Sequence, residues 1–234
     1  MTDFHSHILP DVDDGSQNLD QSLTLLSQLS SFGFDNVVLT PHFYPQDEPL
    51  HSFLERRNNA FSLLCKHNTT NVKLYLGCEC YLHEYLFFAD DLSPLCINET
   101  NYLLTELSYE RRDGQRMLDY IDRLTAKYNV KPILAHIERY PYIMNDPDMF
   151  FEFLLKGCFA QVNLPSLDQF FIKKKLLKYI SKGYVNFIGT DTHKTVQPLI
   201  DCFDKVSKSL TAIIDDNWQK YFQSIDTFMN VKLI

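Results

Sequence analysis

The sequence has little glycine and no excess of positive charge. Glycine occurs only 7 times in 234 residues, and 10 prolines are scattered along the chain, which excludes collagen-like and low-complexity disordered sequence. The formal net charge is −8, from 22 basic and 30 acidic residues. The chain therefore lacks the basic face of a non-specific nucleic-acid-binding protein, and we expect no nucleic-acid partner.

Signals of membrane insertion and export are also missing. No apolar run reaches the roughly 18 residues that a membrane span needs, and residues 1–5 form neither a basic nor an apolar leader region. The six cysteines show no disulfide-like spacing and no C-x-x-C pair, which favours reduced thiols that pack as small buried apolar side chains. These features predict a cytoplasmic protein without a membrane span.

Short apolar runs alternate with longer amphipathic stretches. The strand-like runs are residues 3–7, 36–40, 72–77, 102–107, 132–136, 159–163 and 185–189. Helix-like stretches cover 19–32, 53–66, 115–128, 148–156 and 170–182, and Gly33, Gly157 and Gly183 stand where helices should end. The alternation predicts βα units with a parallel sheet. Seven such strands suggest a closed or nearly closed barrel.

No linker or composition break divides the chain, so we predict one domain over residues 1–234. The stretch from about residue 200 onward predicts one or two terminal helices. Its aromatic residues Trp218, Tyr221 and Phe222 are expected to pack on the barrel, with a subunit contact as the alternative.

Potential metal ligands follow the C-terminal ends of six of the seven predicted strands. They are His5, His7, Asp14, His42, Glu79, Glu106, His136, Asp191 and His193. Such ends converge on one face of a parallel barrel, and strand residues two apart share a side, which pairs His5 with His7 and Asp191 with His193. Imidazoles with carboxylates suit zinc, iron or manganese. The pattern predicts a site for several divalent metal ions.

Motifs for other chemistries are missing. The sequence contains no G-x-x-x-x-G-K, G-x-G-x-x-G or G-x-S-x-G segment, and no cysteine is followed by arginine six positions later. Hydrolysis would therefore use a water molecule activated by metal ions rather than a side-chain nucleophile. Three further histidines, His51, His67 and His83, lie away from the predicted strand ends and are expected to be solvated.

Five motifs carry a family resemblance. They are His5-Ser6-His7-Ile8-Leu9-Pro10 with Asp13-Asp14-Gly15, Thr40-Pro41-His42, Ala135-His136-Ile137-Glu138-Arg139-Tyr140, Gln161-Val162-Asn163 and Asp191-Thr192-His193. In order and spacing they resemble the PHP (polymerase and histidinol phosphatase) superfamily. More narrowly, they resemble the bacterial manganese-dependent tyrosine-protein phosphatases of capsule and exopolysaccharide operons, the CpsB/YwqE type.

The resemblance implies a PHP-type distorted (β/α)7 TIM-like barrel with three divalent metal ions, manganese being expected and iron or zinc possible. By position, the first ion would be held by His5, His7, Glu79 and Asp191; the second by Glu79, Glu106 and His136; the third by Asp14, His42 and His193. Arg139 matches a phosphate-binding arginine. The implied activity is hydrolysis of phosphotyrosine on the C-terminal tail of a partner bacterial tyrosine kinase, by a protein that could be oligomeric.

The sequence departs from the family after His193. Many relatives carry a second phosphate-binding arginine there, whereas this chain has Lys194 and no arginine nearby. We expect Lys194 to take that role, with Arg111 and Arg112 as competitors. Glu138 is expected either to orient Arg139 or to be a surface carboxylate.

Strand alternation also predicts that Cys78 and Cys80 point away from Glu79 and pack behind the site. Two other functions stay open at this point. One is another PHP phosphoesterase, such as a histidinol-phosphate phosphatase, and the other is a non-catalytic binding module with the PHP fold.

Overall fold

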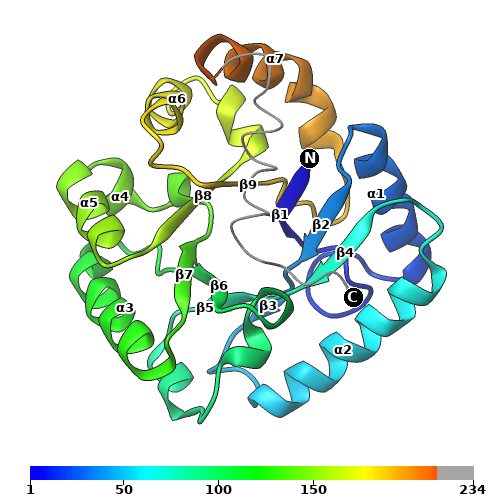
Figure 1. Cartoon of the computed structure of the whole chain (residues 1–234), viewed down its shortest axis with the longest axis horizontal. Coiled ribbons are helices and arrows are strands. Elements are labelled where there is room, and N and C mark those ends of the chain that lie inside the picture. Colours follow the sequence, from blue (N-terminus) through cyan, green and yellow to red (C-terminus); the bar gives the residue numbers. More distant parts are fainter. Residues whose placement is uncertain (215–234) are drawn as a thin grey trace.

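The computed structural model describes residues 1–214 (Figure 1). Its strands are β1 (Thr2–Ser6), β2 (Asn36–Leu39), β3 (His42–Phe43), β4 (Lys73–Leu76), β5 (Glu79–Tyr81), β6 (Tyr102–Glu106), β7 (Lys131–Leu134), β8 (Phe159–Asn163) and β9 (Phe187–Gly189). Its α-helices are α1 (Leu19–Ser31), α2 (Leu50–His67), α3 (Gly114–Tyr128), α4 (Pro141–Met144), α5 (Pro147–Leu155), α6 (Lys173–Ser181) and α7 (Gln197–Ile214). Short 3-10 turns include η1 (Glu84–Phe88), η4 (Arg111–Asp113), η5 (Ile137–Arg139) and η6 (Leu164–Asp168).

All strand pairs are parallel and follow the chain order. One sheet has the order β1-β2-β4 and the other β3-β5-β6-β7-β8-β9. After β9 the chain returns to β1, where Ser6 forms a parallel bridge with Thr192 and the Asp191 amide donates to the His5 carbonyl at 2.8 Å. The fold is therefore α/β, with parallel strands that curl into a barrel-like sheet and helices around it (Figure 1).

The apolar runs predicted the main strands, because each of the seven runs overlaps one of β1, β2, β4, β6, β7, β8 and β9. The very short strands β3 and β5 were not predicted. Gly33, Gly157 and Gly183 do end helices, with φ of 86°, 84° and 72°, a left-handed conformation in which a Cβ is unfavourable. Trp218, Tyr221 and Phe222 lie outside the described residues.

Two apolar clusters hold the fold together. The larger one joins the helices to the sheet, and the smaller one contains residues from several facing strands, among them Phe4, Tyr102, Leu104, Ile133 and Phe187. In this inner apolar cluster the rings of Phe4 and Phe187 meet edge to face with centroids 4.6 Å apart. Side chains therefore fill the space between the strands below the polar strand ends.

No helix within residues 1–214 has both the length and the apolar character needed to cross a membrane.

Candidate metal centre

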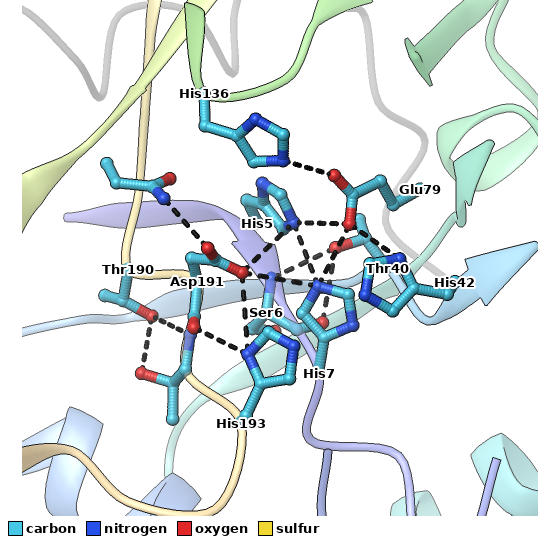
Figure 2. A network of polar contacts seen from close by, with 12 residues as sticks. His5, Ser6, His7, Thr40, His42, Glu79, His136, Thr190, Asp191 and His193 are labelled. Atoms are coloured by element: carbon cyan, nitrogen blue, oxygen red, sulfur yellow. Dashed lines mark hydrogen bonds and ion pairs between the residues drawn. The ribbon is translucent and has the colours of Figure 1, made fainter. Parts of the chain in front are cut away.

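The nine predicted ligands lie together at the C-terminal ends of the strands, and Figure 2 shows all of them except Asp14 and Glu106. His5 belongs to β1, His42 and Glu79 begin β3 and β5, and Glu106 ends β6. The others follow strands: His7 and Asp14 after β1, His136 after β7, Asp191 and His193 after β9. The site therefore gathers one to three side chains from the end of each main strand except β8. We call these nine residues the metal centre.

The ligand atoms form four overlapping groups, each with all atoms within 4.8 Å of one another. The groups are His5, His7 and Asp191; His5, Glu79 and His136; His42, Glu79 and Glu106; and His7, Asp14, His42 and His193. Because neighbouring groups share members, the arrangement suits several ions side by side better than one isolated ion.

The geometry at the middle of the site fits a cation. His5 Nε2 and His7 Nε2 lie 2.9 Å apart, and Glu79 Oε2 lies 3.1 Å and 3.2 Å from these two nitrogens. If both imidazole nitrogens carry a proton, the two N–H groups repel each other. If either nitrogen lacks a proton, its lone pair repels the carboxylate oxygen of Glu79. A divalent ion can instead accept a lone pair from each of them, so the donor set fits a bound metal.

Glu79 is the residue on which the groups converge. Its Oε1 lies 2.7 Å from His136 Nε2, and its Oε2 lies 3.0 Å from His42 Nδ1, while the side chain is 1% exposed. Burial by itself raises the pKa of Glu79, but the surrounding imidazoles, His5 first, hold it well below its usual value. A carboxylate that contacts this many imidazoles is suited to bridge two metal ions.

The electrostatics of the pocket favour positive charge at His5 and His7, whereas burial lowers the pKa of His136 and His193. Burial alone lowers the pKa of His5, but the carboxylates of Glu79 and Asp191 outweigh burial and raise the pKa above its usual value. Burial would raise the pKa of Asp191, yet His5, His7 and Arg139 hold it at about 2. The carboxylates therefore remain charged and can bind cations.

An irregularity in β1 helps to aim His5. Asp3 pairs with Val37 and Ser6 with Leu39, so three steps along β1 oppose two along β2. Such a bulge changes the alternation of side chains. Phe4 joins the inner apolar cluster, while the adjacent His5 joins the metal centre.

Close packing at the end of β9 fixes the other side of His5. A Cβ on Gly189 would lie only 2.4 Å from His5 Cβ, so only glycine fits there. The next residue, Thr190, is held by the buried Asp3, whose carboxylate accepts from the Thr190 amide at 2.8 Å and from its hydroxyl at 2.7 Å. The ends of β1 and β9 are therefore locked together.

Asp191 and His193 converge for a reason other than the one predicted. β9 ends at Gly189, so strand alternation does not apply to them. Asp191 has φ of 55° and His136 has φ of 29°, both in the left-handed region that non-glycine residues seldom adopt. The backbone turns sharply at both positions and directs the two side chains into the metal centre.

Sequence reasoning missed the residues that orient the ligands. The Asp13 carboxylate accepts from His7 Nδ1 at 2.7 Å and from the His42 amide at 2.9 Å. Gln161 Oε1 accepts from the His136 amide at 2.7 Å and lies 3.2 Å from His5 Nδ1. Hydrogen bonds of this kind fix which imidazole nitrogen faces a metal. The Asp13-Asp14 pair and the Gln161-containing motif were the available signals.

Two polar groups at the rim complete the site. The Tyr109 hydroxyl donates to Glu106 Oε1 at 2.5 Å, and Asn163 Nδ2 donates to Asp191 Oδ2 at 2.8 Å. Arg139 is 45% exposed, and its guanidinium pairs with Asp191. One cation predicted to bind phosphate thus lies directly beside a metal-centre carboxylate.

The competing cations lie on the surface. Lys194 is exposed, and its carbonyl accepts from Gln21 Nε2 at 2.9 Å. Arg111 and Arg112 line a separate surface hollow of about 390 Å³ together with Tyr142 and Asp146.

The interpretation of Glu138 as a surface carboxylate was wrong, whereas a role in orienting Arg139 stays a prediction, because the charges of the two side chains interact. The Glu138 carboxylate is buried, and Oε1 accepts from the Asn163 amide at 3.0 Å rather than from Arg139. Burial raises the pKa of Glu138 to about 7.

Other histidines and cysteines mostly follow expectation. His51 and His67 are exposed, but His83 is half-buried and contacts the rings of Tyr81 and Tyr85 just after β5, so its solvated assignment was wrong. Cys78 and Cys80 are fully buried in the larger apolar cluster, as predicted. Cys65 is exposed, because it lies on the outer side of α2, and the prediction of burial fails there.

A curled parallel α/β sheet with clustered histidines and carboxylates at its strand ends defines a class of metal-binding barrel protein. Within that class, the chain belongs to the capsular polysaccharide synthesis family CpsB/CapC, whose family model matches residues 1–218.

Characterised relatives span most of the chain. A putative tyrosine-protein phosphatase CapC of Staphylococcus aureus is 29% identical over 246 aligned residues, covering 100% of this chain and 91% of the relative. Tyrosine-protein phosphatase CpsB of Streptococcus pneumoniae is 27% identical, covering 82% of this chain and 83% of the relative. Tyrosine-protein phosphatase YwqE of Bacillus subtilis is 25% identical, covering 82% and 77%.

Solved structures share the fold. A structure from work on YwqE of Bacillus subtilis and CpsB of Streptococcus pneumoniae, described as unique metal-dependent tyrosine phosphatases, aligns with a TM-score of 0.77 at 20% identity and covers 100% of this chain and 96% of its own. A phosphotriesterase homology protein of Escherichia coli aligns with a TM-score of 0.51 at 12% identity, covering 95% and 98%. At these identities the likeness supports the fold alone.

Proposed function

We propose that this protein is a metal-dependent protein-tyrosine phosphatase. The observation that carries the proposal is the convergence on Glu79 of His5, His42 and His136 at 2.7–3.1 Å, in a family whose named relatives are tyrosine-protein phosphatases. The substrate is the phosphotyrosine of a protein, in this proposal the C-terminal tail of a bacterial tyrosine kinase that regulates capsular or exopolysaccharide synthesis, and the location is the cytoplasm.

We propose a single domain over residues 1–234 with a distorted (β/α)7 barrel, and the strand topology of the described residues 1–214 supports the barrel. β2 and β3 together form one barrel position, and β4 and β5 form another, since only two residues separate the members of each pair. With β1, β6, β7, β8 and β9 this gives seven positions, and the Ser6–Thr192 bridge closes the ring.

The metal centre would hold three divalent ions, manganese being the first choice and iron or zinc the alternatives. In this proposal the first ion is held by His5, His7, Glu79 and Asp191, the second by Glu79, Glu106 and His136, and the third by Asp14, His42 and His193. The four groups of converging ligand atoms overlap these sets, although they place Glu106 with His42 and Glu79 rather than with His136. When bound, such ions supply Lewis acidity toward the phosphoryl oxygens and lower the pKa of water toward neutrality.

The chain's own residues have distinct tasks. Arg139 offers paired N–H donors at the rim, a geometry that matches two oxygens of a phosphate, and Asn163 holds Asp191 so that Arg139 has a fixed partner. Lys194, directly after His193, adds a second positive charge. Asp13 and Gln161 keep the imidazoles of His7 and His5 turned inward. Fixed positive groups of this kind stabilise the charge that develops in phosphoryl transfer.

The test is hydrolysis by purified protein after chelation and metal add-back, with phosphotyrosine peptide, histidinol phosphate and p-nitrophenyl phosphate as substrates. We expect activity that returns with metal and favours the phosphotyrosine peptide. Preference for histidinol phosphate would instead assign the other PHP activity, and metal binding without hydrolysis would assign a binding module.

Arg139→Ala sharpens this test. Losing a charged hydrogen bond to phosphate costs about 1.5–3 kcal/mol, which lowers kcat/KM about tenfold to a hundredfold. Arg123→Ala is the matched control, because Arg123 is exposed on α3 and its guanidinium lies over the Phe87 ring. An equal fall in both variants would contradict the role of Arg139.

A further inference from the structure

The outer side of α6 and the residues just before it form an unusual surface. Phe170 and Phe171 are 88% and 95% exposed, and no other large hydrophobic side chain in residues 1–213 is more exposed than these two. Their rings meet edge to face with centroids 5.4 Å apart. Two adjacent phenylalanines in this state leave a large apolar area in water.

A row of lysines continues from these rings. Lys174 and Lys178 are exposed and stand four residues apart on α6, so they share one side of the helix, and the exposed Lys182 follows as its C-cap. We call Phe170, Phe171 and these three lysines the Phe–Lys patch. Phe171 and the three lysines line a hollow of about 460 Å³ whose other walls include Phe151 and Tyr184.

The charge of this patch contrasts with that of the chain. Residues 169–184 contain five lysines and no aspartate or glutamate, whereas the whole chain has a net charge of −8. The nearby Asp168 contacts Lys173 and Lys205, which are not members of the row. Like charges four residues apart on a helix repel one another, so the row is favourable when it faces an anionic partner.

We propose that the Phe–Lys patch docks the protein on the surface of an anionic lipid bilayer. Exposed aromatic rings insert at the boundary between headgroups and acyl chains, while lysines contact lipid phosphates, the arrangement of interfacial helices. Both phenylalanine rings project almost completely into solvent. A fluid lipid layer can surround such projecting rings without a preformed pocket. An acidic protein segment would need a pocket that matches the shape of the two rings.

The position of the patch is compatible with access to the metal centre. η6 leads from the C-terminal end of β8 toward Phe170, and Asn163 at that strand end contacts Asp191. Figure 1 shows α6 at the edge of the molecule between α5 and α7. The patch therefore begins at the strand ends that carry the metal centre, and docking does not require a membrane-spanning helix.

The test is co-sedimentation of the full chain with vesicles of phosphatidylcholine alone and of phosphatidylcholine mixed equally with phosphatidylglycerol. We expect binding to the mixed vesicles only, weakened by added salt. Lys174→Gln/Lys178→Gln/Lys182→Gln should lower the partition coefficient by about fivefold per lysine. Phe170→Ser/Phe171→Ser should lower it by about tenfold or more.

Matched controls separate the patch from general charge and hydrophobicity. Lys66→Gln/Lys73→Gln/Lys208→Gln removes the same charge from other exposed sites, and Phe88→Ser removes an aromatic ring that is 77% exposed elsewhere. The Phe88 control should bind as the parent does, and the lysine control should keep more binding than the patch variant. No binding to mixed vesicles, or equal losses in patch and control variants, would overturn the proposal.

Measurements without lipid complete the design. Circular dichroism and thermal unfolding of the patch variants should match the parent, because the substituted side chains are exposed. Light scattering should give the same mass for the parent and Phe170→Ser/Phe171→Ser. A smaller mass for the variant would show that a second copy of the chain covers the patch, which would also overturn the proposal.

Discussion

The inner apolar cluster and the metal centre draw on several of the same strands but differ in chemistry and in burial. The core residues of the inner cluster are all buried, whereas the metal centre ranges from the fully buried His5 to Asp14, which is 70% exposed. β6 contributes Tyr102 and Leu104 to the first and Glu106 to the second, and β1 contributes Phe4 and His5. Burial of apolar side chains stabilises a fold, whereas burial of charged groups costs free energy unless a partner or cation compensates. The inner apolar cluster therefore stabilises the fold, whereas the metal centre provides the candidate functional groups.

The largest expected effect on stability comes from the inner apolar cluster. Phe187 is fully buried, and its ring contacts those of Phe4, Tyr102 and Phe159 at centroid distances of 4.6, 6.4 and 6.0 Å. Phe187→Ala should lower the free energy of unfolding by about 3–5 kcal/mol, measured by urea denaturation. The exposed Phe88→Ala should change it by less than about 0.5 kcal/mol. If Phe187→Ala lost activity but kept its free energy of unfolding, the proposed division between a stabilising inner apolar cluster and a functional metal centre would be wrong.

Glu79→Gln tests the role of the metal centre. The amide keeps the shape of the side chain but loses the charge that four imidazoles face, so metal should be lost and kcat/KM should fall by about a hundredfold to a thousandfold. Metal analysis and phosphotyrosine-peptide kinetics measure this, with circular dichroism to show that the fold is kept. Glu138→Gln is the control, because that buried glutamate contacts the Asn163 amide and is not in the metal centre. Full metal content in Glu79→Gln would contradict the site.

The sequence predicted the longer apolar strands but neither the short strands β3 and β5 nor the irregularity in β1. Long apolar runs report burial directly, but β3 and β5 contain only two and three residues, too few to show a period. Pro41 interrupts the run between β2 and β3, since proline cannot donate to a sheet. The irregularity in β1 arises from packing between distant segments, which no local pattern reveals.

The same limit applies to the metal centre. Residue type and position at strand ends were enough to predict that these nine side chains converge, because parallel strands bring those ends together. Asp13, Gln161 and Tyr109 act through hydrogen bonds whose geometry exists only in the folded chain. The surface interpretation of Glu138 failed because its carboxylate is buried and accepts from the Asn163 amide, a partner distant in sequence.

Cys78 and Cys80 lie at the border between apolar packing and metal chemistry. Both are fully buried in the larger apolar cluster on either side of Glu79. Cys78→Ala/Cys80→Ala should lower the free energy of unfolding by about 2 kcal/mol through lost packing and leave metal content unchanged. Urea denaturation and metal analysis check both halves. Loss of a metal ion would show that a thiol takes part in the metal centre.

The smallest expected effect on kcat/KM tests whether the phosphate site extends beyond the metal centre and Arg139 to Lys194. Lys194 is exposed and follows His193 directly, and the hydrogen bond from Gln21 to its carbonyl fixes its backbone. A phosphate held by metal ions and Arg139 would gain one further charged contact from Lys194. Its loss in Lys194→Ala should lower kcat/KM for phosphotyrosine peptide about tenfold.

The comparison with Arg111→Ala/Arg112→Ala decides the assignment. Those arginines line a hollow with Tyr142 and Asp146, so an aspartate already lies beside them, and their loss should change kcat/KM by less than about twofold. Lys194→Arg should retain activity, because guanidinium keeps the charge and adds a second donor, whereas Lys208→Ala, an exposed lysine on α7, should have no effect. A tenfold fall in the arginine pair with an unchanged Lys194→Ala would move the second phosphate contact to the η4 segment. If kcat/KM is unchanged in both Lys194→Ala and Arg111→Ala/Arg112→Ala, Arg139 and the metal ions alone bind the phosphate. The phosphate site would then not extend to the exposed cations.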